Sequence, residues 1–406
     1  MISNHPRREE LLAQLKQNSH TVRPAGNRGF TCDFITSADL DAAEYPLEWI
    51  IEGVMVEGQP AIWGGEKKTL KTSIAIDLAV SLGARSYDPH FLGHFDVPNR
   101  KRVLVLSGES GEATIQETVR RVCRSKNVSM LDMSVHWSFR LPRLSSGKDI
   151  TELVRVIRGE GEEIVIFDPL YLCLLAGNSD LQAANLYHIG PLLRDVSQAC
   201  LEAGATPIML HHAVKRKSNE RNRPMELSEL SFAGVAEFAR QWLLLSHRRP
   251  FDPNDPRGAH QLWMNVGGSA GFHGLWGVDI TQGQVRETLR ARHWGVRVMS
   301  ADSARQHGVE EVQNRRTHRA STREADDSAR MLEALAGYPD GETQSTLADE
   351  VRFARAKAKA VLNRLIEDGR VERCDFTRCN GRGTRPVSGY RLVREDGDDS
   401  GSSASD

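Results

Sequence analysis

The stretch Ala61–Leu82, AIWGGEKKTLKTSIAIDLAVSL, decides the fold. It opens with a short apolar run, passes through Gly64-Gly65 and a polar turn, and continues from Lys71-Thr72 into a longer apolar run. A short apolar run bounded by glycine is typical of a buried strand, whereas the run after Lys71 has the length of a helix. The stretch therefore predicts a strand, a tight lysine-rich turn and a helix over Thr72–Leu82.

This order of elements is the context of a Walker A loop, in which backbone N–H groups and a helix N-terminus surround phosphates. Lys71 is then expected to contact the β- and γ-phosphates, and the Thr72 hydroxyl to bind Mg²⁺. Leu70 stands where the pattern has its second glycine, which puts the backbone geometry of the loop in question. The alternative is a lysine-rich turn without a ligand. The candidate nucleotide-binding residues are Gly64, Gly65, Glu66, Lys67, Lys68, Thr69, Leu70, Lys71, Thr72 and Ser73.

Outward from this stretch, short apolar runs alternate with helical patterns. The expected strands are Ala61–Trp63, Val103–Leu106, Val135–Phe139, Ile164–Phe167 and Pro207–Leu210. The expected helices are Thr72–Leu82, Gly111–Cys123, Asp149–Arg158 and Ala184–Ala203. This alternation predicts an α/β domain with a mainly parallel central sheet, covered on both faces. Later strands are expected at Trp242–Ser246, His260–Val266, Trp276–Ile280 and Gln284–Leu289, the last two joined by a hairpin at Thr281-Gln282-Gly283.

Two acidic residues follow predicted strands. Asp168 directly follows the run IVIF, at the end of a predicted buried strand, which is the position of a Walker B aspartate. It is therefore expected to orient Mg²⁺ through a water molecule. Glu109 follows the run VLVL and is a candidate to polarise the attacking water, with Glu112 as the alternative. Because the carboxyl ends of parallel strands meet at one edge of a sheet, we expect Glu109, Asp168 and the phosphate loop to share a crevice. The alternative is that each acid belongs to an exposed turn.

Two histidines end another predicted strand. His211 and His212 follow the run PIML, so they are expected beside the same crevice. One of them is a candidate to contact the γ-phosphate or its water, and packing or capping is the other interpretation. Adjacent strand residues point to opposite faces, which argues against one shared metal ion.

The elements GGEKKTLKTS, LVLSGES, IVIFDPL and PIMLHHAVK, in this order, resemble those of the RecA-like ATPases. The resemblance covers roughly residues 45–290 and is to the AAA_25 group, which contains the RepA-type hexameric replicative helicases of plasmids and phages. It implies a RecA-like P-loop core that binds ATP and Mg²⁺ and hydrolyses ATP at subunit interfaces. By this resemblance the catalytic residues are Glu109, Lys71 and His212, and Mg²⁺ is held by Thr72 and, through water, by Asp168.

Two features depart from that group. Leu70 is the first. The second is the segment HQLWMNVGGSAGFHG, which has no lysine or arginine after its strand, where these helicases often carry a pair that reaches the neighbouring subunit. Substitutes for that pair would be Lys215, Arg216, Arg240 or Arg248.

Basic charge gathers in two places. Residues 214–224 contain five Lys or Arg and one Glu, so a loop with Lys215, Arg216 and Lys217 is expected either to follow single-stranded DNA or to be solvated. Residues 329–394 have the periodicity of three helices followed by a hairpin, which predicts a small C-terminal winged-helix domain. Ten Lys or Arg and four acids in residues 351–385 favour duplex DNA over protein contact, with Arg355, Lys357 and Lys359 early in the third helix.

The remaining organisation follows from composition. The chain has 406 residues, a formal net charge of −1 and six cysteines, which excludes a disulfide scaffold and a globally basic protein. The polar N-terminus and the lack of long apolar runs predict a cytoplasmic protein without a membrane span. The expected divisions are a lead-in (1–45) with an N-cap at Thr36 or Ser37, the ATPase domain (46–290), a flexible charged linker (291–328), the winged helix (329–394) and a disordered acidic tail (395–406).

These features lead to one hypothesis and two alternatives. The hypothesis is an ATP-hydrolysing protein acting on DNA, as a helicase or replication ATPase that forms a homo-oligomer, with a hexamer as the form that the resemblance implies. The alternatives are an ATP-gated DNA-binding regulator with little turnover and a recombination mediator.

Overall fold

The computed structural model describes residues 34–85, 89–176, 185–216, 222–283, 292–380 and 383–393. The chain divides into two units, Met1–Glu48 and Trp49–Asp406. In the first unit, α2 (Ser37–Ala42) begins after Thr36, whose side chain accepts a hydrogen bond from the backbone N–H of Asp39. The predicted N-cap at Thr36 is therefore confirmed. The predicted lead-in over residues 1–33 lies outside the described residues.

The second unit is built on a nine-stranded sheet in the order β11-β10-β9-β8-β3-β7-β6-β4-β5, counted over the described residues. Neighbouring strands from β8 to β5 are parallel, and those from β8 to β11 are antiparallel. The mainly parallel sheet agrees with the predicted fold class. The strands are β3 (Ala61–Gly65), β4 (Val103–Ser107), β5 (Val135–Ser138), β6 (Ile164–Asp168), β7 (Thr206–His212), β8 (Gln241–His247), β9 (Ala259–Gly268), β10 (His273–Thr281) and β11 (Gly295–Ser300).

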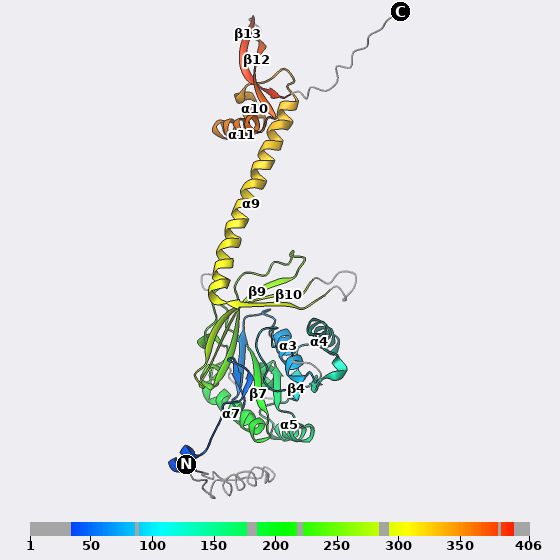
Figure 1. The fold of residues 1–406 in the computed structure, drawn as a ribbon, viewed down its shortest axis with the longest axis vertical. Coiled ribbons are helices and arrows are strands. Elements are labelled where there is room, and N and C mark those ends of the chain that lie inside the picture. Colours follow the sequence, from blue (N-terminus) through cyan, green and yellow to red (C-terminus); the bar gives the residue numbers. More distant parts are fainter. Residues whose placement is uncertain are drawn as a thin grey trace, which may run out of the picture. The chain divides into compact units, whose positions relative to one another are not determined.

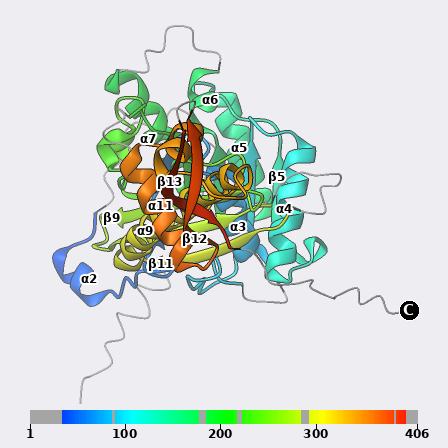
Figure 2. The same cartoon turned by 90° about the horizontal axis from the view of Figure 1, so that it is seen from above.

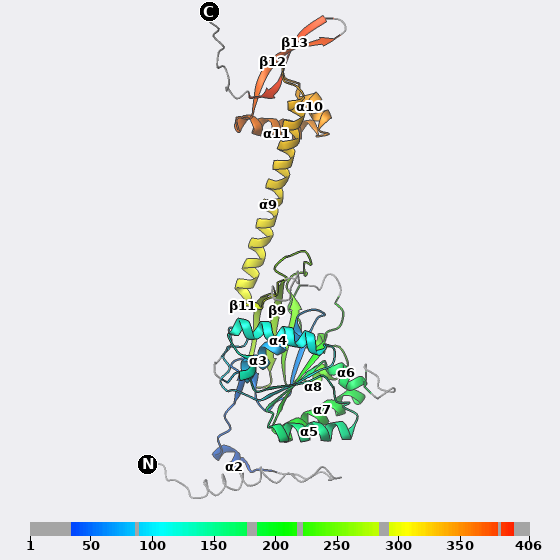
Figure 3. The same ribbon diagram turned by 90° about the vertical axis from the view of Figure 1, so that its right-hand side faces the viewer.

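Helices cover both faces of the parallel strands (Figures 1 and 3). Alternate residues of one strand point to opposite faces, so Trp63 packs in one apolar cluster and Ile62 in the other. The first cluster includes α3 (Lys71–Gly83), α4 (Glu112–Lys126) and the small pair β1 (Trp49–Ile51) and β2 (Met55–Val56). The second includes α5 (Gly147–Glu160), α6 (Leu170–Leu175), α7 (Leu186–Glu202) and α8 (Val235–Phe238). Short 3₁₀ turns lie at Met130–Asp132 and Leu227–Glu229.

The five strands predicted for the parallel part are confirmed, with ends that differ by one or two residues. The later strands at Trp242–Ser246, His260–Val266 and Trp276–Ile280 are confirmed as β8, β9 and β10. The strand predicted at Gln284–Leu289 lies outside the described residues. The partner of β10 in the structure is β11, so the sheet continues ten residues beyond the domain boundary predicted at residue 290.

The flexible linker predicted over residues 291–328 is wrong for most of its length. Strand β11 is followed directly by α9 (Ala301–Ala336), which begins at the N-cap Ser300. Low apolar content suggested a linker, but Ala, Arg, Gln and Glu all have high helix propensity. Both ends of α9 are also anchored, because Ala304 packs with Met299 of β11 while Met331 and Leu335 are buried in the C-terminal core.

The C-terminal residues form three helices and a hairpin around one apolar core. The end of α9 packs with α10 (Gln344–Glu350) and α11 (Arg355–Glu367), and α11 packs against the hairpin of β12 (Val371–Asn380) and β13 (Gly383–Leu392). These elements are seen from two sides in Figures 1 and 3, and Figure 2 looks down on them along α9. Glu342, which lies in the chain between α9 and α10, forms an isolated antiparallel β-bridge with Tyr390 of β13. The predicted order of elements is therefore present. No helix in the described part of the chain is long and apolar enough to cross a membrane.

Candidate active site

The predicted site residues follow four adjacent strands. Strand β7 lies between β3 and β6, and β4 lies beyond β6, so the carboxyl ends of all four meet at one edge of the sheet. Gly65 of β3 pairs with His212 of β7, and Ser107 of β4 pairs with Asp168 of β6. The backbone N–H of Gly108 donates to the carbonyl of Asp168 at 2.8 Å. The structure thus brings the loop, both acids and the second histidine together, as predicted from the order of the motifs.

The phosphate loop keeps its expected backbone shape although Leu70 replaces a glycine. Leu70 has φ 62° and ψ 27°, which is the left-handed conformation that glycine adopts without cost. Its side chain packs against the apolar cluster beneath α3. The residue also serves as the N-cap of α3 and gives no side-chain cap, so the first N–H groups of the helix stay available as donors.

Lys71 lies at the start of α3 with its side chain inside the loop. Its ammonium donates to the carbonyls of Gly65 and Glu66, each at 3.0 Å. Burial lowers the pKa of Lys71 to about 8, against the opposing effect of the nearby acids Asp168, Glu109 and Glu66. The lysine is therefore a buried cation whose present acceptors are neutral carbonyls.

The outer part of the loop is held by a buried arginine. Glu66 accepts from the backbone N–H of His247 at 2.9 Å and lies 3.3 Å from the guanidinium of Arg216. Arg216 makes two further bonds of 2.7 Å to the carboxylate of Glu229. The prediction that Arg216 faces DNA is therefore wrong, because its side chain is 3% exposed and paired with carboxylates.

Asp168 and Thr72 form the candidate magnesium site. The Thr72 hydroxyl lies beside the buried Asp168 carboxyl, close enough to affect its pKa. Burial raises the pKa of Asp168 to about 6, an effect that the Thr72 hydroxyl and Lys71 oppose. A divalent cation beside this carboxyl would favour its charged form.

Glu109 follows β4 at the same edge of the sheet and is half-exposed. Its Oε1 accepts a hydrogen bond of 2.6 Å from the Tyr171 hydroxyl and lies 3.9 Å from Nε2 of His212. The Tyr171 and His212 rings are 5.5 Å apart. Tyr171 was not predicted, although it stands three residues after Asp168 in DPLY. The sequence carries no signal that the side chain turns back to a neighbouring strand.

The two histidines have different surroundings. His211 is fully buried, contacts Ser231 through Nε2 and packs on the Phe232 ring. Burial lowers its pKa to about 4. His212 is partly exposed beside Glu109, and burial together with Lys71 lowers its pKa. Of the two interpretations, packing fits His211, and His212 lies where the candidate sensor is expected.

These residues fit ATP with Mg²⁺. The start of α3 offers uncapped N–H donors, Lys71 offers a buried ammonium, and Thr72 with Asp168 offers the oxygen ligands that Mg²⁺ prefers. A Cβ on Gly65 would lie 2.8 Å from the Thr69 hydroxyl oxygen, so the glycine also lets the loop close on itself.

A polar network that the sequence did not predict lies beside the loop. Arg121 of α4 is buried and donates to Ser73 at 3.3 Å and to the Gln282 side chain at 2.8 Å. Gln282 also accepts from Arg292, which in turn pairs with Glu117. The network joins the start of α3 to the end of β10. Gln282 lies 161 positions from Arg121, so no local pattern could pair them.

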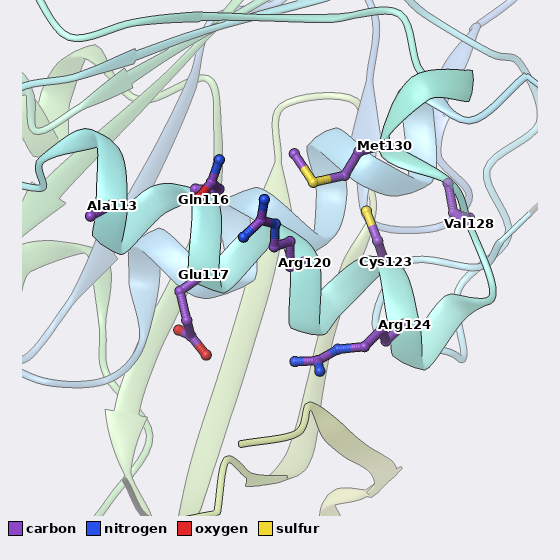
Figure 4. A pocket seen from close by; sticks show the side chains of 8 residues that line it. All are labelled: Ala113, Gln116, Glu117, Arg120, Cys123, Arg124, Val128 and Met130. Atoms are coloured by element: carbon purple, nitrogen blue, oxygen red, sulfur yellow. The ribbon is translucent and has the colours of Figure 1, made fainter. Parts of the chain in front are cut away.

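A hollow of about 480 Å³ lies along α4, where Cys123, Val128 and Met130 form an apolar part beside Arg120 and Arg124 (Figure 4). None of the phosphate-loop residues lines it. It is therefore separate from the candidate site, although Glu117 belongs both to its lining and to the polar network.

The other predicted cations divide by exposure. Arg248 is buried, pairs with Asp279 and donates to the Ala304 carbonyl, so it is not a finger for another subunit. Lys215 and Arg240 are exposed. Lys217 lies outside the described residues.

On α11, the predicted DNA-contacting residues Arg355, Lys357 and Lys359 are all exposed. Lys357 differs from the other two because it pairs with Asp327 of α9 at 2.7 Å and lies over the Phe353 ring.

Comparison with known proteins supports the nucleotide site. Residues 31–218 match the family model AAA_25, described as an AAA domain. The matched part contains the phosphate loop, Glu109, Asp168 and His212, and it ends before the antiparallel strands. A search of curated proteins finds no match. The match and the mainly parallel sheet together support a P-loop ATPase with a RecA-like core.

Proposed function

We propose that this protein binds ATP with Mg²⁺, hydrolyses the γ-phosphate and uses the turnover on DNA, as a RepA-type helicase or replication ATPase. The observation that carries the proposal is the meeting of the Walker A loop, Glu109, Asp168 and His212 at four adjacent strand ends. A protein that only binds nucleotide has no need of an acid opposite the phosphate loop, and Glu109 occupies that position.

Each side chain has a distinct task in this proposal. The Lys71 ammonium would move from the carbonyls of Gly65 and Glu66 to the β- and γ-phosphate oxygens, which are charged and therefore stronger acceptors. Thr72 and Asp168 would hold Mg²⁺, which neutralises charge on the phosphates when it is bound. Glu109 would accept a proton from the attacking water, and His212 would contact the γ-phosphate or that water.

DNA is the partner that the distribution of cations favours. The three C-terminal helices and the hairpin are consistent with a winged helix, in which α11 would be the recognition helix. Its exposed Arg355 and Lys359 are suited to duplex phosphates. Lys215, exposed after β7, is suited to single-stranded DNA.

An ATP-gated regulator with little turnover is the second candidate. It is favoured by the end of β9, where Asn265–Gly268 carries no cation to complete a neighbouring site. Of the proposed substitutes, Lys215 and Arg240 remain exposed, while Arg216 and Arg248 are tied to carboxylates. A homo-oligomer would therefore depend on one of those two exposed residues for a finger acting between subunits.

ATP hydrolysis by the full chain, measured with and without single-stranded DNA, tests the proposal. We expect DNA-stimulated turnover that is lost in Lys71→Ala and reduced to a residual rate, roughly 10²–10⁴-fold lower, in Glu109→Gln, while Glu109→Gln still binds nucleotide. Nucleotide binding that requires Lys71 but gives no turnover under either condition would exclude the motor and favour the regulator.

Duplex binding is tested separately with Lys359→Ala and its paired neighbour Lys357→Ala. Loss of an exposed phosphate contact should weaken binding to all sequences and lower the salt slope by about one. Lys357→Ala should instead loosen the contact between α9 and α11. Unchanged affinity and salt slope in Lys359→Ala combined with Arg355→Ala would argue against α11 as the DNA-binding helix.

A further inference from the structure

The Tyr171 hydroxyl donates a hydrogen bond to Glu109, the side chain proposed to activate water. Tyr171 is the second residue of α6, which follows Asp168 and Pro169 directly. Its hydroxyl donates to Oε1 of Glu109 at 2.6 Å. The bond therefore joins the segment that follows β6 to the segment that follows the neighbouring strand β4. No role in phosphate or magnesium binding accounts for this contact, because Tyr171 reaches neither Lys71 nor Thr72 in the hydrogen bonds of the described residues.

Glu109 needs an external partner to have a fixed direction. Its backbone is well placed, because the preceding Gly108 bonds to the Asp168 carbonyl and a Cβ there would overlap with Leu141. Its side chain is 45% exposed, however, and has several rotatable bonds. A half-exposed glutamate loses rotamer entropy each time it is brought to a reacting water, and a partner that orders it beforehand removes that loss from the chemical step.

Tyr171 is a rigid partner. The neighbouring residues Leu170, Cys173 and Leu174 are fully buried and fix the short α6 to the core of the domain. The ring packs beside His212 with centroids 5.5 Å apart. A phenol has only two side-chain torsions before its hydroxyl, so the oxygen is held where the ring is held. The bond to Glu109 raises the pKa of Tyr171 to about 12, so the phenol remains a donor throughout the physiological range.

Tyr171 and His212 both lie nearest to the same carboxylate oxygen of Glu109, Oε1. The Tyr171 hydroxyl and Nε2 of His212 lie 2.6 Å and 3.9 Å from Oε1. A carboxylate that acts as a base needs one oxygen for the proton, and the other is free to be used for orientation. This geometry assigns orientation to Oε1 and leaves Oε2 for the water.

We propose that Tyr171 is a positioning residue for ATP hydrolysis, which holds Glu109 by Oε1 so that Oε2 receives the proton of the attacking water. The inference rests on the proposed ATPase function. In the step, the water oxygen bonds to the γ-phosphorus as the bond from that phosphorus to the β,γ-bridging oxygen breaks. The electron pair of that bond leaves with ADP, and the proton of the water passes to Glu109.

A double-mutant cycle tests the assignment with the full-length protein and Mg-ATP. The four proteins are wild type, Tyr171→Phe, Glu109→Gln and the double variant, each measured for kcat, KM and nucleotide affinity. Tyr187→Phe is the matched control, because Tyr187 is 85% exposed and loses the same hydroxyl on α7. We expect Tyr171→Phe to lower kcat on the order of tenfold with unchanged nucleotide affinity, which is a part of the roughly 10²–10⁴-fold that general-base catalysis contributes.

The cycle separates positioning from a structural role. If Tyr171 acts through Glu109, then Tyr171→Phe lowers kcat in the wild-type background and has no further effect when Glu109 is already Gln. An equal loss in both backgrounds, an unchanged kcat, or a kcat that rises would each overturn the assignment. Weakened nucleotide binding in Tyr171→Phe would likewise show a structural role in place of positioning.

Failure of the underlying function gives a different pattern. Wild-type protein without turnover would remove both the ATPase proposal and the role of Tyr171. Full turnover in Glu109→Gln would leave the ATPase activity in place and remove the role of Glu109 as the base, and with it the role of Tyr171. Turnover that needs Glu109 but is indifferent to Tyr171 would remove the role of Tyr171 alone.

Discussion

The left-handed backbone at Leu70 offers a direct test of the phosphate-loop geometry. Leu70 has φ 62°, a conformation that costs a residue with a Cβ roughly 1–2 kcal/mol. The informative comparison is between Leu70→Gly and Leu70→Ala. Both variants remove the same packing atoms beyond the Cβ, and only glycine releases the backbone.

The expected difference follows from three contributions. Loss of the half-buried leucine side chain costs both variants about 1 kcal/mol, half the value of a fully buried one. Glycine regains the conformational cost of roughly 1–2 kcal/mol but loses about 0.5–1 kcal/mol in backbone entropy relative to alanine. Leu70→Gly should therefore be close to wild type and more stable than Leu70→Ala by roughly 0.5–1 kcal/mol.

Thermal unfolding without nucleotide measures this difference. For a domain of this size, 1 kcal/mol corresponds to about 2–4 °C, so Leu70→Gly should melt about 2 °C above Leu70→Ala. The matched control is Gln198, exposed on α7, where Gly should be less stable than Ala by about 1 kcal/mol, as in an ordinary helix.

The order of the two variants decides the question. If Leu70→Ala melts at or above Leu70→Gly while the Gln198 pair behaves as expected, Leu70 is not left-handed. Leu70 would then not take the backbone conformation that the second glycine has in other phosphate loops.

Three further perturbations follow from the burial of charged groups. Lys71→Met should raise the melting temperature without nucleotide, because it removes a desolvated ammonium, and should abolish the stabilisation by Mg-ATP; Lys148→Met, at an exposed lysine of α5, should do neither. Arg216→Ala should lower the free energy of unfolding by roughly 2–4 kcal/mol, since it removes the buried guanidinium that bridges Glu66 and Glu229, whereas the exposed Lys215→Ala should change it by less than about 0.5 kcal/mol in the same denaturant titration. Burial lowers the pKa of His211 to about 4 while the unfolded value is about 6.5, so the unfolded state binds more protons and stability falls as pH drops through that range. Melting temperatures from pH 7 to 5 should fall less steeply in His211→Gln, and equal slopes would contradict the shift.

The local elements were predictable from the sequence because each depends on nearby residues. Apolar runs such as Val103–Leu106 are short and bounded by polar residues, so their periodicity specifies a buried strand. The order of motifs also placed Glu109 and Asp168 at strand ends. The order of the strands in the sheet was not predictable, because it depends on which crossovers the chain makes between distant elements.

The errors have a common physical cause. Arg216 has the sequence context of a basic loop, yet Glu66 and Glu229 lie on other elements and bury its guanidinium. Tyr171 and Arg121 acquire their roles in the same way, through partners 62 and 161 positions away. For residues 301–328, composition predicted a flexible linker, but the charged residues of α9 are good helix formers. Both ends of this helix are also packed against apolar residues that lie elsewhere in the chain.

The present contacts of Lys71 indicate which ligands the loop can select. Its ammonium already has two neutral acceptors, the carbonyls of Gly65 and Glu66, and a ligand must offer better ones to draw it away. Charged oxygens make hydrogen bonds roughly twice as strong as neutral ones, so a polyphosphate meets that condition and a nucleoside does not. Because the ammonium is buried, an anion also offsets the desolvation that lowers its pKa. A preference for phosphate would thus arise from the burial of the ammonium as well as from the donors at the start of α3.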